Sequence, residues 1–596
     1  MVSHLSLTSC VPSGRPPRYV GVDDWSRQVV SVIDGLLAIW DDERSSSGVR
    51  LALDVDDDVR LAQRSRDGRL WAVLTGDNVL VVHDADAVVA RHAVDGSRHR
   101  CLGLHWVDTD LADLAVVTTA AVCFFAVDAG HSALKLVRAQ TRPAVAGAFL
   151  ASHRLLMSID PRNRFHLWSI GRQGPPKKVC RFEFGVVADV PPHQLAGQVH
   201  LVDLYAAPTL LLVDQAAGKL HVCAIEGSTM RQTNTFDLFA TSAATFTVYV
   251  IDNVVAVLSS EHPRVPMLFD TRSATAPVVA PLPMQADLSP GRALPPDHVS
   301  LPDGSVRRLQ LNLAAIADSR GMSDAGCLMA FLQRRRHSEA DLLRLLSAVV
   351  QQERLTAALS RCLSLLSTCA LLNGADDDPV PLPSGTRVAQ ADVAAALRQV
   401  LSVVSPRHLE AVCVEYVHCL LTHHVAPTAE LVMLTVDTML KGRRLGRLQQ
   451  FVQFHIFPDS PVLAHRLCLL GASLHPPLLQ LGLDMLSRLG WHDDVVGAIL
   501  SKLSGDPDQG LLTAFRYVST GSGSDLHKHG TSLRRLLSLA TSADVPPAVL
   551  FDVHNYIVDH MRDALEVVSD EESQRLLLAA FARRFGGNYA LSSHSH

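Results

Sequence analysis

Lysine, aromatic residues and net charge are all scarce in this chain of 596 residues. It contains 7 Lys against 47 Arg, a preference typical of genome composition, so clustered arginines alone are a weak sign of phosphate binding. Aromatic residues make up 5% of the chain, and the formal net charge is −6. Because binding of single-stranded nucleic acid requires aromatic side chains interleaved with cations, we expect no nucleic-acid partner.

Paired cysteines are also absent. The 11 Cys are scattered and none forms a CxxC pair, which argues against zinc ribbons and thioredoxin-type redox sites. Their odd number and apolar neighbours predict buried, reduced thiols in a cytosolic protein. Hydrophobic residues make up 48% and charged ones 19%, a globular composition, and the length predicts two to four domains.

The sequence contains none of the short motifs of common enzymes. Neither GxxxxGKS/T nor GxGxxG occurs, so the chain is not expected to bind a nucleotide. Neither GxSxG nor HExxH occurs, so no nucleophile elbow or zinc-protease helix is predicted. We predict no catalytic, cofactor-binding or metal-binding residues, no cofactor, and a protein that is not an enzyme.

Apolar runs long enough to cross a bilayer are missing as well. Leu114–Val127 is too short, and Leu463–Leu489 contains two prolines and Asp484, whereas a spanning helix needs about 20 apolar residues. We interpret both as buried strands or packed helices. The start, Met1–Arg15, is polar and lacks the apolar segment of a signal peptide, so we expect a cytoplasmic location.

Short apolar runs are abundant between residues 18 and 315. They are four to eight residues long and are bounded by Gly, Asp, Asn or Pro, a pattern typical of strands joined by tight turns. The predicted strands are Val29–Ile33, Leu36–Trp40, Val49–Leu53, Leu70–Leu74, Val79–Val82, Leu114–Val117, Val122–Val127, Leu155–Ser158, Phe165–Ser169, Leu210–Val213, Leu220–Ile225, Phe246–Val250, Val254–Leu258, Pro266–Phe269 and Val306–Leu311.

A train of strands this long cannot close as one small barrel, whereas a β-propeller limits exposed edges by repeating blades around an axis. Blades of ~40–45 residues predict about seven of them, or six. Two strands carry a tryptophan near their ends, Trp40 and Trp168, but no complete GH…WD repeat occurs. A pair of β-sandwiches is the alternative. We interpret the proline-rich residues 274–304 as a long loop inside the last blade.

Near residue 320 the hydrophobic period changes from two to 3.6, which predicts helices from Ser323 onward. Besides Glu339–Val350, the predicted helices occupy residues 354–372, 388–404, 407–422, 427–440, 443–456, 460–472, 476–489, 491–503, 508–518, 530–541, 545–567 and 570–585. Short loops between them predict stacked antiparallel pairs, with a solvated loop at Asn373–Gly385. We therefore predict a β-propeller at 18–315 followed by an α-helical solenoid at 322–590.

Two basic clusters lie in the helical half. They are Arg334-Arg335-Arg336-His337 after the first helix and Lys441, Arg443, Arg444 and Arg447 around a turn between two helices. Each could contact anionic lipid or an acidic partner. The favoured interpretation is that they are solvated cations at the C-terminal ends of helices, where the helix dipole stabilises positive charge.

The remaining candidates have simpler interpretations. Phe451, Phe454 and Phe457 recur every third residue and predict the buried seam of one helix, in preference to a partner groove. His423-His424 ends a helix, which suits the dipole without a metal. We assign polar turns or polar segments to Asp56-Asp57-Asp58, Gly521-Ser522-Gly523-Ser524, His527, His529, His594 and His596.

Several segments resemble a known family. Leu448–Leu489 reads LQQFVQFHIFPDSPVLAHRLCLLGASLHPPLLQLGLDMLSRL. This is similar to the C-terminal domain of the third subunit of the Mon/Ccz complex, the Bulli or Mic-one family. Further similar segments are Leu328–Arg336, Glu415–Val417, Ala514–Val518, Ile251–Asp270, Ala133–Val137 and Leu102–Trp106. The resemblance is strong over about 325–520, patchy over 20–315 and absent beyond 525.

The resemblance implies a non-catalytic subunit of the guanine-nucleotide exchange factor for the late-endosomal Rab GTPase, Rab-seven. In that complex the longin-type domains of the Mon and Ccz partners open the nucleotide pocket, and the propeller–solenoid subunit supports them on membranes. It further implies a heterotrimer with Mon and Ccz and a peripheral position on late endosomes and lysosomes. The implied roles are endosome maturation, autophagy and lysosomal trafficking.

Two alternatives differ from this prediction. The first is a propeller–solenoid subunit of another vesicle tethering or coat complex, although the RING-type cysteine cluster of some such subunits is missing. The second is an enzyme with its site in the central channel of the propeller, which would require convergent carboxylates or histidines at the starts of the strands.

Overall fold

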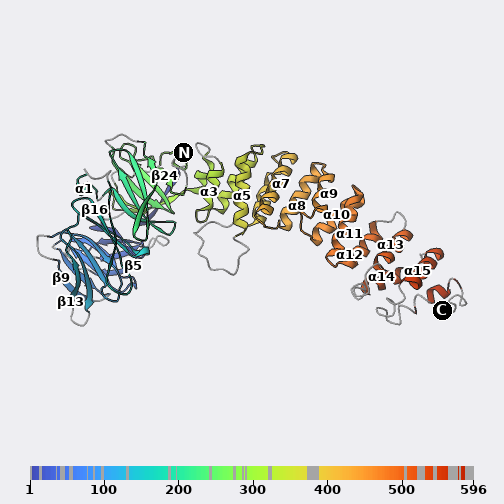
Figure 1. Ribbon diagram of the computed structural model, residues 1–596, viewed down its shortest axis with the longest axis horizontal. Coiled ribbons are helices and arrows are strands. Elements are labelled where there is room, and N and C mark those ends of the chain that lie inside the picture. The colour runs from blue at the N-terminus through green and yellow to red at the C-terminus, as the bar shows by residue number, and fades with distance from the viewer. Residues whose placement is uncertain are drawn as a thin grey trace. The chain divides into compact units, whose positions relative to one another are not determined.

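The fold is described from a computed structural model (Figure 1). The residues described are 3–11, 17–34, 36–40, 47–52, 58–76, 78–84, 87–94, 99–128, 133–184, 190–195, 197–239, 244–272, 277–284, 288, 291–319, 325–371, 388–502, 507–519, 530–540, 546–560, 575, 579–583 and 585. Contacts divide them into two compact units, the first ending at Leu345 and the second beginning at Leu346.

The first unit contains seven antiparallel sheets (Figure 1). Their strands in chain order are β1 (Leu5–Val11); β2 (Tyr19–Val22), β3 (Val29–Ile33), β4 (Leu36–Trp40) and β5 (Ser47–Ala52); β6 (Val59–Arg64), β7 (Trp71–Thr75), β8 (Val79–His83) and β9 (Val88–Ala93); β10 (Cys101–Trp106), β11 (Leu114–Thr118), β12 (Val122–Asp128) and β13 (Ala133–Gln140); β14 (Ala146–Leu150), β15 (Leu155–Ile159), β16 (Arg164–Ser169) and β17 (Lys177–Glu183); β18 (Val199–Leu204), β19 (Ala207–Asp214), β20 (Lys219–Glu226) and β21 (Thr229–Asp237); β22 (Phe246–Ile251), β23 (Val254–Ser259) and β24 (Met267–Asp270); β25 (Arg292–Leu294), β26 (His298–Ser300) and β27 (Val306–Leu311). A 3₁₀ turn, Ala151–His153, and a short helix, α1 (Pro192–Leu195), lie between strands.

These sheets are the seven blades of a β-propeller, which confirms the predicted fold and its count of about seven. The first strands of neighbouring blades contact one another: β2 with β6, β6 with β10, β10 with β14, β14 with β18, and β22 with β25. They therefore form the inner wall of the ring. The last blade has the order β1-β27-β26-β25, so a strand from the start of the chain pairs with Val306–Leu311 and joins the two ends of the ring.

Burial explains why only some of these strands are visible in the sequence. The middle strands of a blade are covered on both faces: every residue of β7 and of β23 is buried. Outer strands are covered on one face at most, and β13 buries one residue of its eight. The apolar side chains of successive blades pack together: Val213 of β19 and Val255 of β23 belong to one continuous cluster.

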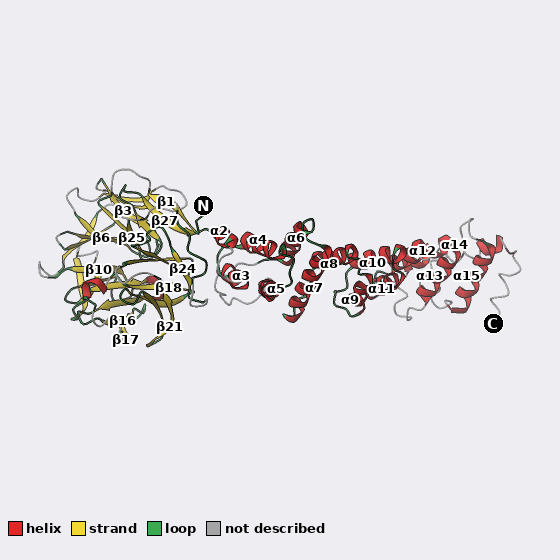
Figure 2. Ribbon diagram, turned by 90° about the horizontal axis from the view of Figure 1, so that it is seen from above, coloured by secondary structure: helices red, strands yellow, loops and turns green. Residues whose placement is uncertain are grey.

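The helices follow the last strand (Figure 2). They are α2 (Leu313–Asp318), α3 (Ala325–Gln333), α4 (Glu339–Val350), α5 (Ala357–Leu371), α6 (Gln390–Val400), α7 (Pro406–Thr422), α8 (Ala429–Lys441), α9 (Leu445–Gln453), α10 (Pro461–Ser473), α11 (Pro476–Arg488), α12 (His492–Lys502), α13 (Pro507–Ser519), α14 (Gly530–Ala540) and α15 (Pro547–His560). By its contacts, α3 belongs to the first unit, with the propeller.

From α5 onward, each helix packs against helices that are one or two positions away in the chain, which is the contact pattern of a solenoid. The closest pair is α10 and α11. A Cβ at Gly471 of α10 would lie 2.1 Å from the Leu479 nitrogen, and one at Gly482 of α11 would lie 2.7 Å from the Cys468 sulfur. Glycine at both positions therefore allows the two backbones to approach, and the helical prediction is confirmed.

The two apolar segments tested for membrane crossing are accounted for within these units. Leu114–Val127 forms β11 and most of β12, and Leu463–Leu489 forms most of α10 and α11. None of the helices in the described part of the chain has the length and apolarity that crossing a bilayer requires.

Candidate functional sites

No catalytic or metal-binding constellation was predicted, and the described residues contain no group of three or more His, Cys, Asp or Glu that could hold a metal ion. His423 is the C-cap of α7, and its Nε2 lies 3.1 Å from the Ser364 hydroxyl.

Burial raises the pKa of the Cys223 thiol to about 11 and that of Cys413 to about 12, so both remain protonated and unreactive. Asp56, Asp57, Gly521–Ser524, His527, His529, His594 and His596 lie outside the described residues.

The first basic cluster forms a buried ion-pair site within the first unit. The chain leaves α3 after Gln333, and Arg335 turns back toward the propeller, where its side chain is 0% exposed. Its Nη2 lies 3.0 Å from Oδ2 of Asp270, the last residue of β24, which is also 0% exposed. Two blades therefore contribute to this site, because Tyr205, between β18 and β19, donates a hydrogen bond of 2.6 Å to the other Asp270 oxygen.

Further contacts saturate the Arg335 side chain. It donates to the Tyr205 hydroxyl and to the carbonyl of Asp252, in the β22–β23 turn. The guanidinium carbon lies 4.5 Å from the centre of the Phe331 ring and 5.5 Å from that of Tyr205, distances at which a cation is attracted to an aromatic face. Burial raises the pKa of Tyr205 to about 12, so the phenol remains a donor.

This geometry corrects both interpretations of the cluster for Arg334 and Arg335, but not for Arg336 and His337. Arg335 is neither solvated nor available to lipid. Arg334 also pairs with Asp270, at 3.0 Å, and its side chain is 25% exposed. Arg336 and His337 are exposed, although the Arg336 backbone N–H donates to the Asp252 carboxylate. The cluster thus holds α3 against the propeller. Leu328–Arg336 and Ile251–Asp270, two segments singled out for their resemblance to one family, meet here.

The second basic cluster follows the expected pattern. Lys441 ends α8, and Lys441, Arg443 and Arg444 are exposed. Arg447 reaches Glu410 of α7 at 3.0 Å, and the glutamate side chain is 3% exposed. The cluster is therefore a solvated helix end with one partner in a neighbouring helix.

The phenylalanine prediction is wrong in part. The three residues do not share a helix, because α9 ends at Gln453 and Phe454 is its C-cap, 70% exposed. Phe457 lies in the following loop and is 1% exposed, and its ring centre is 5.3 Å from that of Phe451. Only two of the three rings therefore form the seam. The period-three spacing gave no sign that the helix stops between them.

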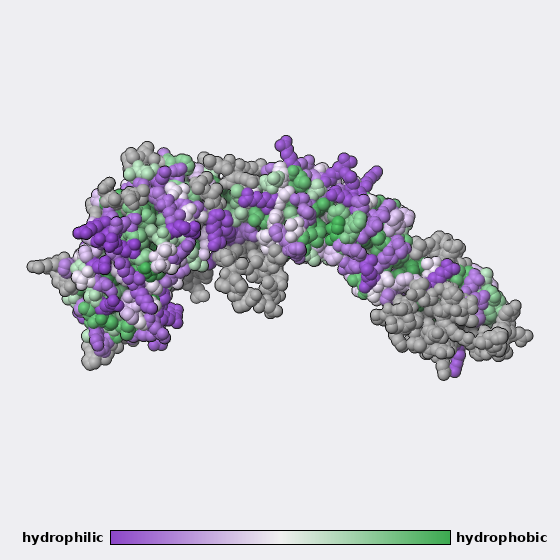
Figure 3. All heavy atoms as spheres, viewed as in Figure 1, coloured by the Kyte–Doolittle hydropathy of each residue, from purple (hydrophilic) through white to green (hydrophobic). Residues whose placement is uncertain are grey.

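An apolar surface lies on α10 in the same segment. Val462 and Leu469, seven residues apart on one face of the helix, are 58% and 51% exposed. His465 lies between them and is in edge contact with the ring of Trp491, which is 46% exposed. We call Val462, His465, Leu469 and Trp491 the α10 stripe. Figure 3 shows hydrophobic residues reaching the surface over this part of the helical unit. Contiguous apolar patches on a surface mark protein contact sites, and the α10 stripe is a candidate for one.

These features define a class: a β-propeller followed by a helical solenoid. Residues 363–557 match the family model "Regulator of MON1-CCZ1 complex, C-terminal". This match runs from α5 to α15 and extends past residue 525, where no resemblance was recognised in the sequence. The helical domain of this chain is therefore similar to that of the regulators of the MON1-CCZ1 complex, and the predicted resemblance is confirmed.

Curated relatives bear the same name. The chain is 28% identical over 291 residues to the mouse regulator of MON1-CCZ1 complex, which covers 44% of this chain and 42% of the relative. It is 34% identical over 137 residues to the human protein, covering 22% and 19%. The homologue of Dictyostelium discoideum is 30% identical over 97 residues, covering 16% and 10%. The chain thus spans less than half the length of the curated relatives that it matches.

Two solved structures similar to this chain are β-propeller domains. That of Cps50 (Swd1) from Myceliophteria thermophila matches 52% of this chain and 100% of its own length, with a TM-score of 0.37 and 12% identity. The Nup133 propeller of Vanderwaltozyma polyspora matches 52% and 98%, with a TM-score of 0.34 and 8% identity.

Proposed function

We propose that this chain is a non-catalytic scaffold and regulatory subunit of a MON1-CCZ1-type complex. The observation that carries the proposal is the family match over residues 363–557, together with relatives whose name places them with that complex. The absence of a metal-binding group among the described residues is compatible with a role by surface contact. The complex would be the nucleotide exchange factor for the late-endosomal Rab GTPase, with the chain peripheral on late endosomes and lysosomes.

In this proposal the longin-type partners carry out nucleotide exchange and the chain fixes their orientation at the membrane. The α10 stripe supports a contact role because it lies inside the matched segment and keeps apolar side chains in water. A stable assembly buries about 1,200 Å² or more, and a stripe of this kind would form the apolar centre of a larger polar interface.

Co-expression with Mon and Ccz partners tests the assembly. We expect the three chains to co-elute, and Val462→Asp to reduce co-elution, because a carboxylate would be buried without a partner at the centre of the interface. Val403→Asp is the matched control: Val403 is 68% exposed and lies between α6 and α7. Failure of the folded wild-type chain to co-elute would reject the proposal. Equal behaviour of the two variants would reject the stripe alone.

A second experiment tests the regulatory role. Release of a fluorescent GDP analogue from the late-endosomal Rab is followed on vesicles, with the longin pair alone, this chain alone, and all three chains. We expect no release by this chain alone and faster release by the trimer than by the pair. Release catalysed by the chain alone would show that it is an exchange factor in its own right.

A further inference from the structure

Arginines gather at one end of the propeller's inner wall. The first strands of the blades run in the same direction around the axis, so the residues at which they start lie at one end of the ring. Arg18 precedes β2, Arg60 is the second residue of β6, Arg100 precedes β10 and Arg292 starts β25. These strands belong to four consecutive blades, counted from the last blade through the third. No repeat in the sequence indicates this grouping.

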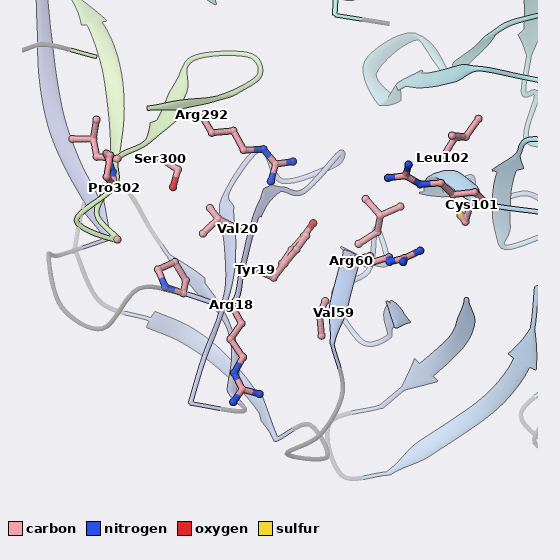
Figure 4. Close-up of a pocket in the computed structure, with 15 residues that line it drawn as sticks. Arg18, Tyr19, Val20, Val59, Arg60, Cys101, Leu102, Arg292, Ser300 and Pro302 are labelled. Atoms are coloured by element: carbon pink, nitrogen blue, oxygen red, sulfur yellow. The ribbon is translucent and has the colours of Figure 1, made fainter. Parts of the chain in front are cut away.

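The four arginines line one cavity of about 560 Å³, which we call the arginine pocket. In Figure 4, Arg292 and Arg60 come from different blades and lie on either side of Tyr19, while Arg18 extends away from Arg292. The Tyr19 hydroxyl accepts a hydrogen bond of 3.2 Å from the Ala62 backbone N–H, so blades that contribute arginines are also joined beneath them. The volume is within the usual range of small-molecule sites.

The described residues that line this pocket carry charge of one sign. They include four arginines and no aspartate or glutamate. Asp303 lies in the β26–β27 turn beside the pocket. Its carboxylate accepts hydrogen bonds of 2.6 and 2.9 Å from the Ser305 hydroxyl and backbone N–H. Burial raises the pKa of the Cys101 thiol to about 11, so this lining residue adds no negative charge. Within the described residues, no carboxylate lies at ion-pair distance from Arg60, Arg100 or Arg292.

The opposite end of the inner wall is different. A second cavity, of about 730 Å³, lies where the first strands end, and its lining includes Asp203, Asp252 and Asp297 along with arginines. There Arg308 pairs with Asp297 at 2.7 Å. At that end Arg308 has a carboxylate partner on the propeller. Among the described residues, no such partner lies beside Arg60, Arg100 or Arg292 of the arginine pocket, so their charge is available to a ligand. The general arginine richness of the chain does not explain this difference between its two ends.

We propose that the arginine pocket binds a small ligand carrying two or more phosphate groups. Guanidinium groups match phosphate oxygens with paired hydrogen bonds, and convergence of cations from several blades suits several phosphates on one compact molecule. The apolar floor, which includes Val59 and Leu102, suits a carbon ring or chain between them. The source is either a free polyphosphate or the headgroup of a membrane lipid. This inference does not depend on the proposed function, because the pocket lies in the propeller and the family match lies in the helices.

The test is a calorimetric titration of the full chain with inositol hexakisphosphate, with inositol as the uncharged reference. We expect saturable binding of the phosphorylated compound and none of inositol. Arg60→Gln with Arg292→Gln should weaken binding by about tenfold per arginine, the usual effect of losing a charge-assisted hydrogen bond. The matched control is Arg181→Gln with Arg231→Gln, which removes the same charge from exposed arginines of the outer strands β17 and β21 and should leave the affinity unchanged.

A second arm distinguishes the sources. Flotation with phosphatidylcholine vesicles, with and without phosphatidylinositol bisphosphate, should recover the wild-type chain with the phosphorylated lipid if the ligand is a headgroup. Calorimetric binding without flotation assigns a free polyphosphate. The proposal is overturned if neither probe binds, or if the control variant loses as much affinity as the pocket variant, since binding would then follow net charge. Unchanged circular dichroism of both variants shows that each remains folded.

Discussion

The two units differ in the number of charged side chains that they bury. Those buried in the first unit are Asp23, Asp160, Asp214, Asp270, Asp297 and Arg335, whereas among the described residues of the second unit only Glu410 is buried. A helix satisfies its own backbone, so a solenoid can be held together by apolar seams alone. A propeller must join separate sheets, and here aspartates bind the turns and strand ends that connect them, as Asp23 does by accepting from the Arg64 backbone N–H.

This difference explains why one basic cluster of the sequence is buried and stabilises the fold, while the other stays in solvent. Arg334–His337 and Lys441–Arg447 look alike in the sequence, and both follow helices. The first lies beside a propeller that offers Asp270 and Tyr205, and it becomes a buried anchor. The second lies among helices where, within the described residues, Glu410 is its ion-pair partner, and most of it stays in water. The neighbour in space, and not the local pattern, decides between these outcomes.

The largest expected effect comes from removing the anchor. Arg335→Ala leaves Asp270, which is 0% exposed, with less compensation for its charge, and loss of one partner of a buried pair costs about 3–5 kcal/mol. Urea unfolding followed by tryptophan fluorescence is the measurement, since five of the 6 Trp precede residue 170. Arg336→Ala is the control: its side chain is exposed, so we expect a change below about 0.5 kcal/mol. Equal losses in the two variants would show that Arg335 does not act as a buried anchor.

In the helical unit, the residue that we compare with the buried Arg335 is the apolar Phe457. Phe457→Ala removes a ring that is 1% exposed and packs on Phe451, and we expect a loss of about 3 kcal/mol. Phe454→Ala, at 70% exposure, should change stability by less than about 0.5 kcal/mol. Circular dichroism at the helix band reports both. Because no charge is involved, the Phe457→Ala loss should be the same at low and high salt. A strong salt dependence would contradict the assignment of apolar seams to this unit.

Burial also decides which elements could be predicted from the sequence. The middle strands of the blades, such as Val29–Ile33 and Leu36–Trp40, were predicted at their observed bounds because they are apolar on both faces. Outer strands such as β17 and β21 were missed, since half or more of their side chains face water and their pattern resembles a loop. The strand β1 was missed because its partner, β27, lies some 300 residues away.

The helices from α5 to α14 were predicted within a few residues, because each is set by its own apolar face and its near neighbours. Most of the predicted helix 570–585 lies outside the described residues. Two features depended on tertiary contacts and were not predictable from the pattern. One is the end of α9 before Phe454. The other is the convergence of Arg60 and Arg292, more than 200 residues apart, in one pocket. Both depend on where the chain turns in space, which periodicity does not report.

A smaller effect is expected from acid in the propeller. Burial lowers the pKa of His200, in β18, from 6.5 to about 4. Between these values the unfolded chain takes up a proton that the folded chain does not, so stability falls as the pH falls below 6.5. By pH 5 the loss is about 2 kcal/mol. Urea midpoints between pH 7 and pH 5 should therefore fall less in His200→Gln than in the wild type. Parallel profiles would show that His200 does not titrate in this way.

The smallest effect concerns Glu410, the exception in the helical unit. Its carboxylate is nearly buried, but its partner Arg447 is 42% exposed, so water can replace the guanidinium in part. Arg447→Ala should therefore cost about 1 kcal/mol, well below the loss at Arg335, where both partners are inaccessible. Glu410→Gln in the Arg447→Ala background should restore part of it, because the buried group is then uncharged. Hydrogen exchange of α7 and α9 is the measurement. If Arg447→Ala cost as much as Arg335→Ala, solvent access would not be what separates the ion pairs of the two units.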